Sequence, residues 1–559
     1  MASFQPEYAP VAGSLWISAL IALVPLLVVF VCLGVVKMKA HWACALGLLA
    51  SLIVAIFAFR MPVLMAASAA SEGIVYGIFP ITWIVLTAIF LFELTRESGH
   101  HDDLMAIFSM ISTDVRVLGV LIAFSFCAVL EALAGFGAPV AIVGVMLVAI
   151  GIPPLKAAVT VLVGNTFAVP FGAMATPILT GANITDGIWS STANAAQELA
   201  MFISRQSALM AWIVPLLLLV IMDGMRGVKQ VWPLAIVVGL TYSAATWWSA
   251  GALDPGVTNL VAGIVSLAVG VLMLIFWQPK REDGGRAQRS EAKVGGAKIA
   301  WALFPYVLVV AVFMVTQMVP AIKAALAATN IPIHWPGMWD TSGVEPVNLM
   351  HTAAGDPQSI ALYSFTWLSS PGTILLITGI VIGLCYRMSI KTIWKVFATQ
   401  LVKMRWTFVT IGSVLGLAYV MNLSGQTLTI GQWIAGAGVI FPFLAPVLGY
   451  IGTAVTGSGT SATALFAGLQ NSAAQGILGS GASSYAQLPN LLVGANTVGG
   501  AVGKMISPQT LAIAAGAVDL KESEILPKSL PWSAVLIVLL CLLVGLQSTP
   551  ILAWLLPSI

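Results

Sequence analysis

The stretch Ala157–Asp186, AAVTVLVGNTFAVPFGAMATPILTGANITD, decides the fold. It is apolar enough for a membrane helix, yet Asn165, Pro170 and Pro177 interrupt it. A proline inside a helix removes a backbone hydrogen bond and clashes with the preceding turn. In lipid, the freed backbone groups must find partners in protein or in trapped water. The stretch therefore predicts a helix that breaks near mid-membrane, where a site can form.

The same pattern occurs a second time in Leu491–Asp519, LLVGANTVGGAVGKMISPQTLAIAAGAVD. When the two Asn-Thr pairs are aligned, a Gly, a Met, a Thr or Ser and a Pro coincide downstream of them. A second matching pair lies upstream, in Glu131–Pro139 and Ala454–Thr460. Two distant, interrupted segments of this kind are typical of repeat-built membrane proteins with a site at the midplane.

Composition restricts the class of protein further. The 559 residues are 59% hydrophobic and only 8% charged, with a mean hydropathy of +1.00. Repeated apolar runs of about 20 residues predict an all-α polytopic membrane protein with about 12–14 membrane segments. The runs do not alternate as barrel strands do, and no basic tract suggests nucleic acid. The five cysteines lie in or beside apolar runs and are expected to pack there, not to form disulfides or bind metal.

The apolar runs divide the chain into seven parts. The clearest spans are 14–36, 42–60, 74–95, 207–222, 231–249, 257–277, 299–319, 371–386, 406–423 and 531–555. The predicted organisation is spans in 1–95, repeat 1 in 96–206, spans in 207–277, a linker in 278–298, spans in 299–423, repeat 2 in 424–529 and a final span in 530–559. The first run is too long for a cleaved signal peptide and should remain as a span.

Basic residues predict the orientation of the chain. They cluster after the spans ending at 36, 222, 277 and 386, and these loops are predicted to be cytoplasmic, with the N-terminus outside. The first repeat block then begins from inside and the second from outside, so the repeats are inverted. Each block is predicted to form a re-entrant hairpin and a broken helix, and the hairpin tips should face each other near mid-membrane.

Three further segments have distinct compositions. The linker 278–298 is rich in Gly and charge and is predicted to be a flexible cytoplasmic connection. Segment 320–370 contains several Pro and Trp residues, which favours an external interfacial cap over a span. Residues 97–113 and 390–404 are predicted to form amphipathic helices on the inner surface.

Glu131 and Lys504 are the charged candidates for the site. Glu131 lies four residues before Gly135 and far from any loop, where a carboxylate is costly and is usually functional. It suits a proton carrier, although a neutral Glu that ties two helices together is the alternative. Lys504 lies within the second broken helix and could hold a carboxylate as a point charge. The alternative for Lys504 is snorkelling to the inner headgroups.

Neutral candidates surround these charges. Asn165, Thr166, Asn496 and Thr497 occupy matching positions of the repeats and could bind a carboxylate and a hydroxyl group, or serve as polar contacts between helices. Glycine turns at Gly135 and Gly137 would direct helix N-termini towards an anion. A hydroxyl cluster at the second tip contributes further candidates, namely Ser458, Thr460 and Ser461.

Enzymatic and metal chemistry have little support. His100-His101-Asp102-Asp103 lies beside a span end and is interpreted as a solvated turn and not as a metal cluster. No His-Glu-x-x-His or Gly-x-Ser-x-Gly motif occurs, and no cofactor is expected. A sensor is disfavoured because no predicted cytoplasmic segment is large enough for an output domain.

The chain strongly resembles the lactate permease family. The resemblance is carried by LEALAGFGAPVAI (130–142), NTFAVPFGAMATPIL (165–179), IMDGMRGVKQVWP (221–233), TGSGTSATALFAGLQ (456–470) and ANTVGGAVGKMISPQTLAIA (495–514). It implies a plasma-membrane carrier that imports L-lactate, glycolate and related 2-hydroxy monocarboxylates with protons. Some relatives have Asp where this chain has Gly459, so the resemblance places more of the proton coupling on Glu131. A sodium-coupled carboxylate carrier and a monocarboxylate exchanger are the alternatives.

Overall fold

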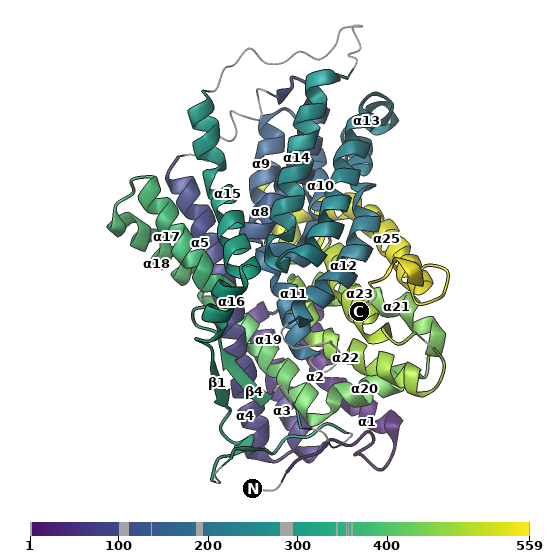
Figure 1. The fold of residues 1–559 in the computed structure, drawn as a ribbon. Helices are drawn as coiled ribbons and strands as arrows, with labels where there is room; N and C mark the ends of the chain where they lie inside the picture. Colours follow the sequence, from purple (N-terminus) through teal and green to yellow (C-terminus); the bar gives the residue numbers. More distant parts are fainter. Residues whose placement is uncertain are drawn as a thin grey trace.

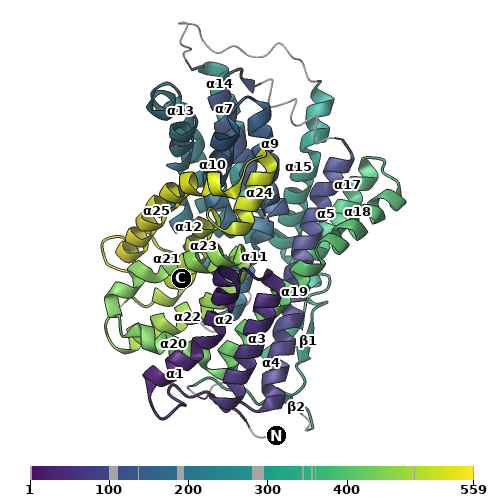
Figure 2. The same ribbon diagram turned by 180° about the vertical axis from the view of Figure 1, so that it is seen from behind.

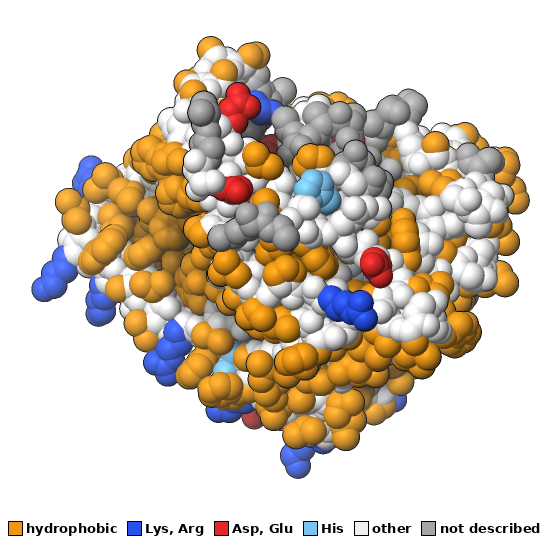
Figure 3. Space-filling view, turned by 90° about the horizontal axis from the view of Figure 1, so that it is seen from below, with side chains coloured by type: hydrophobic (Ala, Val, Ile, Leu, Met, Phe, Trp, Pro, Cys, Tyr) orange, Lys and Arg blue, Asp and Glu red, His pale blue; other side chains and the backbone are white. Residues whose placement is uncertain are grey.

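The computed structural model describes residues 3–99, 111–135, 137–185, 194–279, 295–342, 345–353, 355, 357–358, 361–483 and 485–557. Within these ranges, eleven helices are long and apolar enough to cross a membrane, and three shorter apolar helices accompany them. The prediction of an all-α polytopic membrane protein is confirmed. Figure 3 views the end of the molecule that is lowest in Figure 1; hydrophobic side chains gather towards its lower and left edges, where most of the visible Lys and Arg side chains also lie. Large hydrophobic side chains exposed on the membrane helices, among them Phe57, Phe276 and Leu542, suit contact with lipid.

The N-terminal spans lie mainly in the lower part of Figure 1. They are α1 (Leu15–Ala22), α2 (Val24–Phe30), η1 (Val31–Val35), α3 (Ala40–Phe57), α4 (Val63–Tyr76), η2 (Gly77–Thr82) and α5 (Trp83–Glu97). The predicted span 74–95 is corrected, because the helix already begins at Val63 and η2 divides it where Phe79 is extended and Pro80 follows. The small residues of α4 resemble a loop in sequence, but they allow close packing on α19 (Arg405–Ser424).

The first repeat contains a helical hairpin and a broken helix. The hairpin arms are α7 (Val115–Val120), η3 (Leu121–Phe126) and α8 (Cys127–Ala134) on one side, and α9 (Ala138–Ala149) on the other. At the tip, Gly135 and Gly137 have φ values of 46° and 92°, in the region that glycine adopts most easily. The broken helix comprises α10 (Pro154–Gly164), the 3₁₀ segment η4 (Thr166–Phe171) and α11 (Gly172–Ile184). The break continues to Ala175, since residues 173–175 also have positive φ.

The second repeat has the same order of elements. Its hairpin consists of α21 (Phe441–Thr456) and α22 (Gly459–Gly479), joined at Gly457 with a φ of 76°. Its broken helix consists of α23 (Leu488–Lys504) and α24 (Pro508–Val518). Ser507 caps α24 by accepting a hydrogen bond from the Thr510 N–H at 3.2 Å. Both helices therefore break at the Gly and Pro positions that the sequence alignment of the repeats pairs.

The two repeats exchange packing partners. Helix α9 of the first hairpin packs against α24, and α22 of the second hairpin packs against α11 (Figures 1 and 2). Each hairpin thus contacts the second half of the other repeat's broken helix. Reciprocal contacts of this kind are expected from repeats related by a pseudo-two-fold axis.

Glycines bring α21 and α23 into close contact. A Cβ at Gly449, Gly499 or Gly503 would collide with a backbone carbonyl of the facing helix. Small residues at such positions let helix backbones approach each other in membranes. The contact holds the C-terminal end of α23, and therefore Lys504, beside the second hairpin.

The remaining helices surround the repeats. They are α12 (Ala195–Ala211), α13 (Val214–Ala252), η5 (Pro255–Val257), α14 (Thr258–Phe276), α15 (Gly296–Met318), α17 (Pro371–Cys385), α18 (Ile390–Lys403), α19, α20 (Gln426–Ala435), η7 (Gly438–Ile440), α25 (Glu522–Gln547) and η8 (Ala553–Leu555). The predicted span 207–222 is wrong in its bounds, since it includes the end of α12. The last span starts at Glu522 and not at 531.

The described residues of segment 320–370, called the cap below, form a short helix and four short strands, and the sequence analysis does not predict the strands. The cap comprises α16 (Pro320–Ala327), β1 (Ile331–His334), β2 (Trp339–Asp340), β3 (Val347–Asn348) and β4 (Leu362–Phe365). Strands β1 and β4 pair antiparallel, as do β2 and β3. The Phe4 N–H donates to the Leu349 carbonyl at 2.8 Å, so the chain start also joins the cap.

Helix α18 matches the predicted amphipathic helix 390–404. Most of the linker 278–298, most of 97–113 and the His100–Asp103 turn lie outside the described residues.

Candidate functional site

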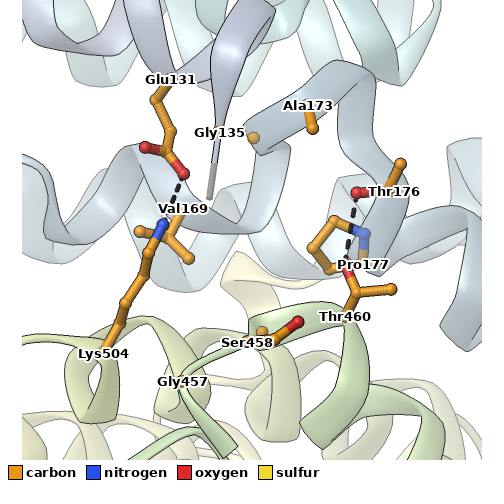
Figure 4. A pocket seen from close by; sticks show the side chains of 12 residues that line it. Glu131, Gly135, Val169, Ala173, Thr176, Pro177, Gly457, Ser458, Thr460 and Lys504 are labelled. Atoms are coloured by element: carbon orange, nitrogen blue, oxygen red, sulfur yellow. Dashed lines mark hydrogen bonds and ion pairs between the residues drawn. The ribbon is translucent and has the colours of Figure 1, made fainter. Parts of the chain in front are cut away.

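The site is organised around an ion pair between the repeats. Glu131 lies in α8, one turn before the first hairpin tip, and Lys504 is the last residue of α23. The Lys504 Nζ atom lies 2.8 Å from Glu131 Oε1, and the two residues are only 6% and 1% exposed. Figure 4 shows the side chains meeting from opposite sides of the cavity. Lys504 therefore points inward and does not snorkel towards a membrane surface.

Asn165 holds the second oxygen of the same carboxylate. Its Nδ2 atom donates to Glu131 Oε2 at 2.9 Å, and its Oδ1 atom accepts from Cys127 Sγ at 3.2 Å. Cys127 and Glu131 are four residues apart on α8 and so share one helix face. Gly172 leaves room for the carboxylate, because a Cβ there would lie 2.7 Å from Glu131 Oε1.

A small cavity of about 20 Å³, which is room for about one water molecule, lies beside the ion pair, and both hairpin tips border it (Figure 4). Its lining residues are Glu131, Gly135, Val169, Gly172, Ala173, Thr176, Pro177, Gly457, Ser458, Gly459, Thr460 and Lys504. The Thr176 and Thr460 hydroxyl oxygens lie 3.3 Å apart and connect the first broken helix to the second tip. The cavity thus offers one ammonium, one carboxylate and several hydroxyl groups within a small volume.

The N-terminus of α22 also faces the cavity. Ser458 caps this helix by accepting from the Ser461 N–H at 3.2 Å, and Gly459 begins it. A helix N-terminus carries a partial positive charge and unpaired N–H groups, which favour an anion. The second tip therefore supplies positive potential from the backbone in addition to the Lys504 ammonium.

The structure separates the predicted site residues into groups. Glu131, Gly135, Ser458, Thr460 and Lys504 line the cavity. Asn165 and Thr166 line a smaller cavity of about 10 Å³, which Lys504 also borders.

Four other candidates line neither cavity. Asn496 is fully buried, and neither polar atom of its side chain has a partner among the described residues. The Thr497 hydroxyl lies 3.3 Å from that of Thr463. Ser461 is buried behind the tip, and Gly137 faces Ile513 of α24.

Two residues were not among the sequence candidates. Thr176 lines the cavity. Its position in the Thr/Ser-Pro pattern that both repeats share is the sequence feature that could have identified it as a site residue. Glu72 is a second fully buried carboxylate, and it was missed because the predicted span began at residue 74. No cluster of three or more His, Cys, Asp or Glu suited to a metal occurs in the part of the chain that the structure describes.

Two hairpins and two broken helices that meet at a buried, charged cavity define a secondary-transporter class of membrane protein. The family model described as L-lactate permease matches residues 18–551. Glycolate permease GlcA of Escherichia coli K12 is 36% identical over 94% of each chain. L-lactate permease of Bacillus subtilis 168 is 34% identical, with 98% of this chain and 99% of the relative covered. The chain belongs to the L-lactate permease family.

This membership defines the class and location of the protein. The relatives are permeases, so the chain is a transporter and not an enzyme. The described residues contain eleven helices long and apolar enough to span a membrane. Family membership and these helices together make the chain a multi-pass plasma-membrane protein. Among solved structures, the YdaH transporter of Alcanivorax borkumensis matches 87% of this chain and 88% of its own, with a TM-score of 0.40 and 14% identity, which is too weak to add to the assignment.

Proposed function

We propose that the protein imports L-lactate, glycolate and related 2-hydroxy monocarboxylates by proton symport across the bacterial inner membrane. The names of the relatives support the substrate class. The observation that carries the coupling is the buried Glu131–Lys504 pair, to which each repeat contributes one charge. The mechanism is an exchange of partners within this pair.

Without substrate, Lys504 neutralises Glu131. A substrate carboxylate entering the cavity competes for the Lys504 ammonium and for the α22 N-terminus. Glu131 is then left as a buried carboxylate without its counter-charge, which is unfavourable in a low-dielectric site. Binding a proton removes that charge. Substrate and proton therefore bind together, and the loaded site carries no more charge than the empty one.

The remaining polar groups are assigned to orientation and recognition. Asn165 positions Glu131 through its 2.9 Å hydrogen bond, and it can still donate, more weakly, to the carbonyl oxygen of the protonated carboxyl group. The hydroxyl groups of Thr176, Ser458 and Thr460 lie where they can bond the 2-hydroxyl of the substrate. Because the cavity has a single ammonium group, it suits one carboxylate better than two.

The cavity is lined by both repeats, so relative motion of the repeats and the surrounding helices would alternate its access to the two sides. Asn496 and Thr497, which lie away from the cavity, are proposed to support this movement of α23 and to join the site only in another state. Ser461 and Gly137 are proposed to support the same movement through the packing of the second and the first hairpin tip.

The test is uptake of radiolabelled lactate into proteoliposomes with an imposed proton or sodium gradient. Symport predicts accumulation driven by the proton gradient in sodium-free buffer, with competition by glycolate and little by succinate. Glu131→Gln should abolish accumulation but keep lactate–lactate exchange, whereas Glu93→Gln in α5 should behave as wild type. Accumulation that needs sodium would favour the sodium-coupled alternative, and exchange without any gradient-driven accumulation in the wild type would favour the exchanger.

A further inference from the structure

Glu72 is a second buried carboxylate that the mechanism above leaves unused. It lies in α4 with no measurable exposure, and neither carboxylate oxygen has a hydrogen-bond partner among the described residues. A buried polar group without a partner costs free energy, and an ionised one costs far more. An ionisable group in a membrane helix that tolerates this cost is usually functional.

Tyrosines from three elements face Glu72. Tyr76 lies one turn further along α4, and its ring is 6.0 Å from that of Tyr419 in α19. Tyr363 belongs to β4 of the cap, and burial together with the nearby Glu72 raises its pKa to about 12. The Tyr363 hydroxyl donates to the Phe79 carbonyl at 2.8 Å, which closes the cap over this end of α4. Glu72 thus lies at the junction of the cap with the membrane helices.

Tyr419 connects this junction to the repeat core. Its hydroxyl oxygen accepts from Asn183 Nδ2 at 2.7 Å, and Asn183 lies near the end of α11. The accepted bond leaves the Tyr419 hydroxyl proton available for another acceptor. Helix α11 is the same helix that carries Thr176 into the central cavity.

Polar side chains form a stripe along α11 between these two points. Thr176, Thr180 and Asn183 are spaced by four and three residues and therefore share one helix face. The stripe spans roughly 10 Å, at about 1.5 Å per residue. Thr180 is fully buried, and its hydroxyl also has no partner among the described residues. The stripe ends at the Thr176–Thr460 contact of the cavity.

We propose that Glu72 is a proton-binding site and that this α11 stripe carries protons between it and the central cavity, apart from the path of the substrate. The proton passes by hops along the hydroxyl groups of Tyr419, Thr180 and Thr176 and the water molecules between them, and ends on Glu131, so no other reactant is needed. Asn183 does not carry the proton; its amide N–H orients the Tyr419 hydroxyl. With the cap outside, as the basic loops predict, Glu72 collects protons from the external side. This inference rests on the proposed symport.

A relay group affects how fast protons arrive but not how many are coupled. Glu72→Gln and Thr180→Val should therefore slow the initial rate of proton-driven lactate uptake by roughly a hundredfold, the lower end of what a positioned proton-transfer group contributes. The final accumulation should be unchanged, and so should lactate–lactate exchange, during which the proton can stay on Glu131. Glu72→Asp should recover much of the rate.

The chain offers matched controls. Thr185→Val changes the buried threonine that follows the last residue of α11, whose hydroxyl donates to the Gly181 carbonyl at 2.8 Å, and Glu93→Gln changes a carboxylate of α5. Both should keep the wild-type rate. The route is overturned if Glu72→Gln and Thr180→Val keep that rate, or if they lose exchange in equal measure, which would indicate a structural role. If the wild type itself shows no proton-driven accumulation, the proposed symport fails and the route fails with it.

Discussion

The two repeats share a framework but differ in chemistry. In the first, Asn165 bonds Glu131 on the neighbouring hairpin arm. In the second, the corresponding Asn496 has no side-chain partner among the described residues, and the residue four positions before the tip glycine Gly457, where Glu131 stands before Gly135, is Thr453. Conversely, Lys504 of the second repeat aligns with Ala173 of the first. Each repeat therefore supplies one half of a single ion pair.

This difference explains how a pseudo-symmetric frame can hold one small anion. Symmetry places two hairpin tips and two helix breaks around a common cavity. A symmetric set of charges would leave either two carboxylates or two ammonium groups facing each other, and both arrangements are unfavourable when buried. One charge from each repeat neutralises the empty cavity and makes it sensitive to a substrate carboxylate.

The largest expected effect follows from removing the ammonium. Lys504→Met keeps the length of the side chain but should abolish lactate uptake, because no cation remains for the substrate. It should also lower the free energy of unfolding by about 3–5 kcal/mol, since Glu131 is left buried and unpaired. Uptake assays and thermal unfolding measure the two effects, and Lys528→Met on the exposed surface of α25 is the control. Uptake near the wild-type level in Lys504→Met would contradict the assignment.

Removing both charges separates stability from function. In the double variant Glu131→Gln/Lys504→Met, no buried charge is left alone, so most of the lost stability should return. Uptake should remain absent. A double variant as unstable as Lys504→Met would indicate that the pair contributes through packing and not through charge.

The two asparagines test the difference between the repeats directly. Asn165→Ala should lower the free energy of unfolding by about 1.5–3 kcal/mol, the range for a hydrogen bond to a charged group. Asn496→Ala removes polar atoms that have no partner among the described residues, so its effect should be smaller. Thermal unfolding of both variants measures this order, and the reverse order would refute the comparison.

The smallest effects are expected at two cavity glycines. At Gly172 a Cβ would lie 2.7 Å from Glu131 Oε1, so Gly172→Ala should displace the carboxylate and reduce proton-driven uptake. At Gly459 a Cβ would lie 3.5 Å from Val169 Cγ1, an ordinary contact, so Gly459→Ala should transport nearly as well as wild type. Equal uptake by the two variants would show that the carboxylate position is not critical.

Much of this organisation could be predicted from local sequence signals. Gly and Pro mark the hairpin tips and helix breaks, because glycine lets the backbone adopt angles that other residues avoid and proline removes a helix hydrogen bond. Glu131 and Lys504 each stand out as charges in apolar segments. Their pairing could not be read from the sequence, because they are 373 residues apart and meet only when the repeats pack together.

Other features depend on tertiary context in the same way. The start of α4 was missed because its small residues resemble a loop unless the facing helix is known. The cap strands are too short to leave a pattern in the sequence. Whether Asn165 or Asn496 reaches the carboxylate depends on which hairpin arm carries it, and the motif shared by the repeats does not contain that information.

The most direct test of the account is proton uptake during substrate binding. Purified protein in a weakly buffered detergent solution with a pH indicator is mixed with lactate, and the protons taken up are compared with the lactate bound. The exchange of partners at Lys504 predicts uptake of one proton for each lactate bound by the wild type, and none by Glu131→Gln. Lactate binding by the wild type without proton uptake, or equal uptake by Glu131→Gln, would contradict it.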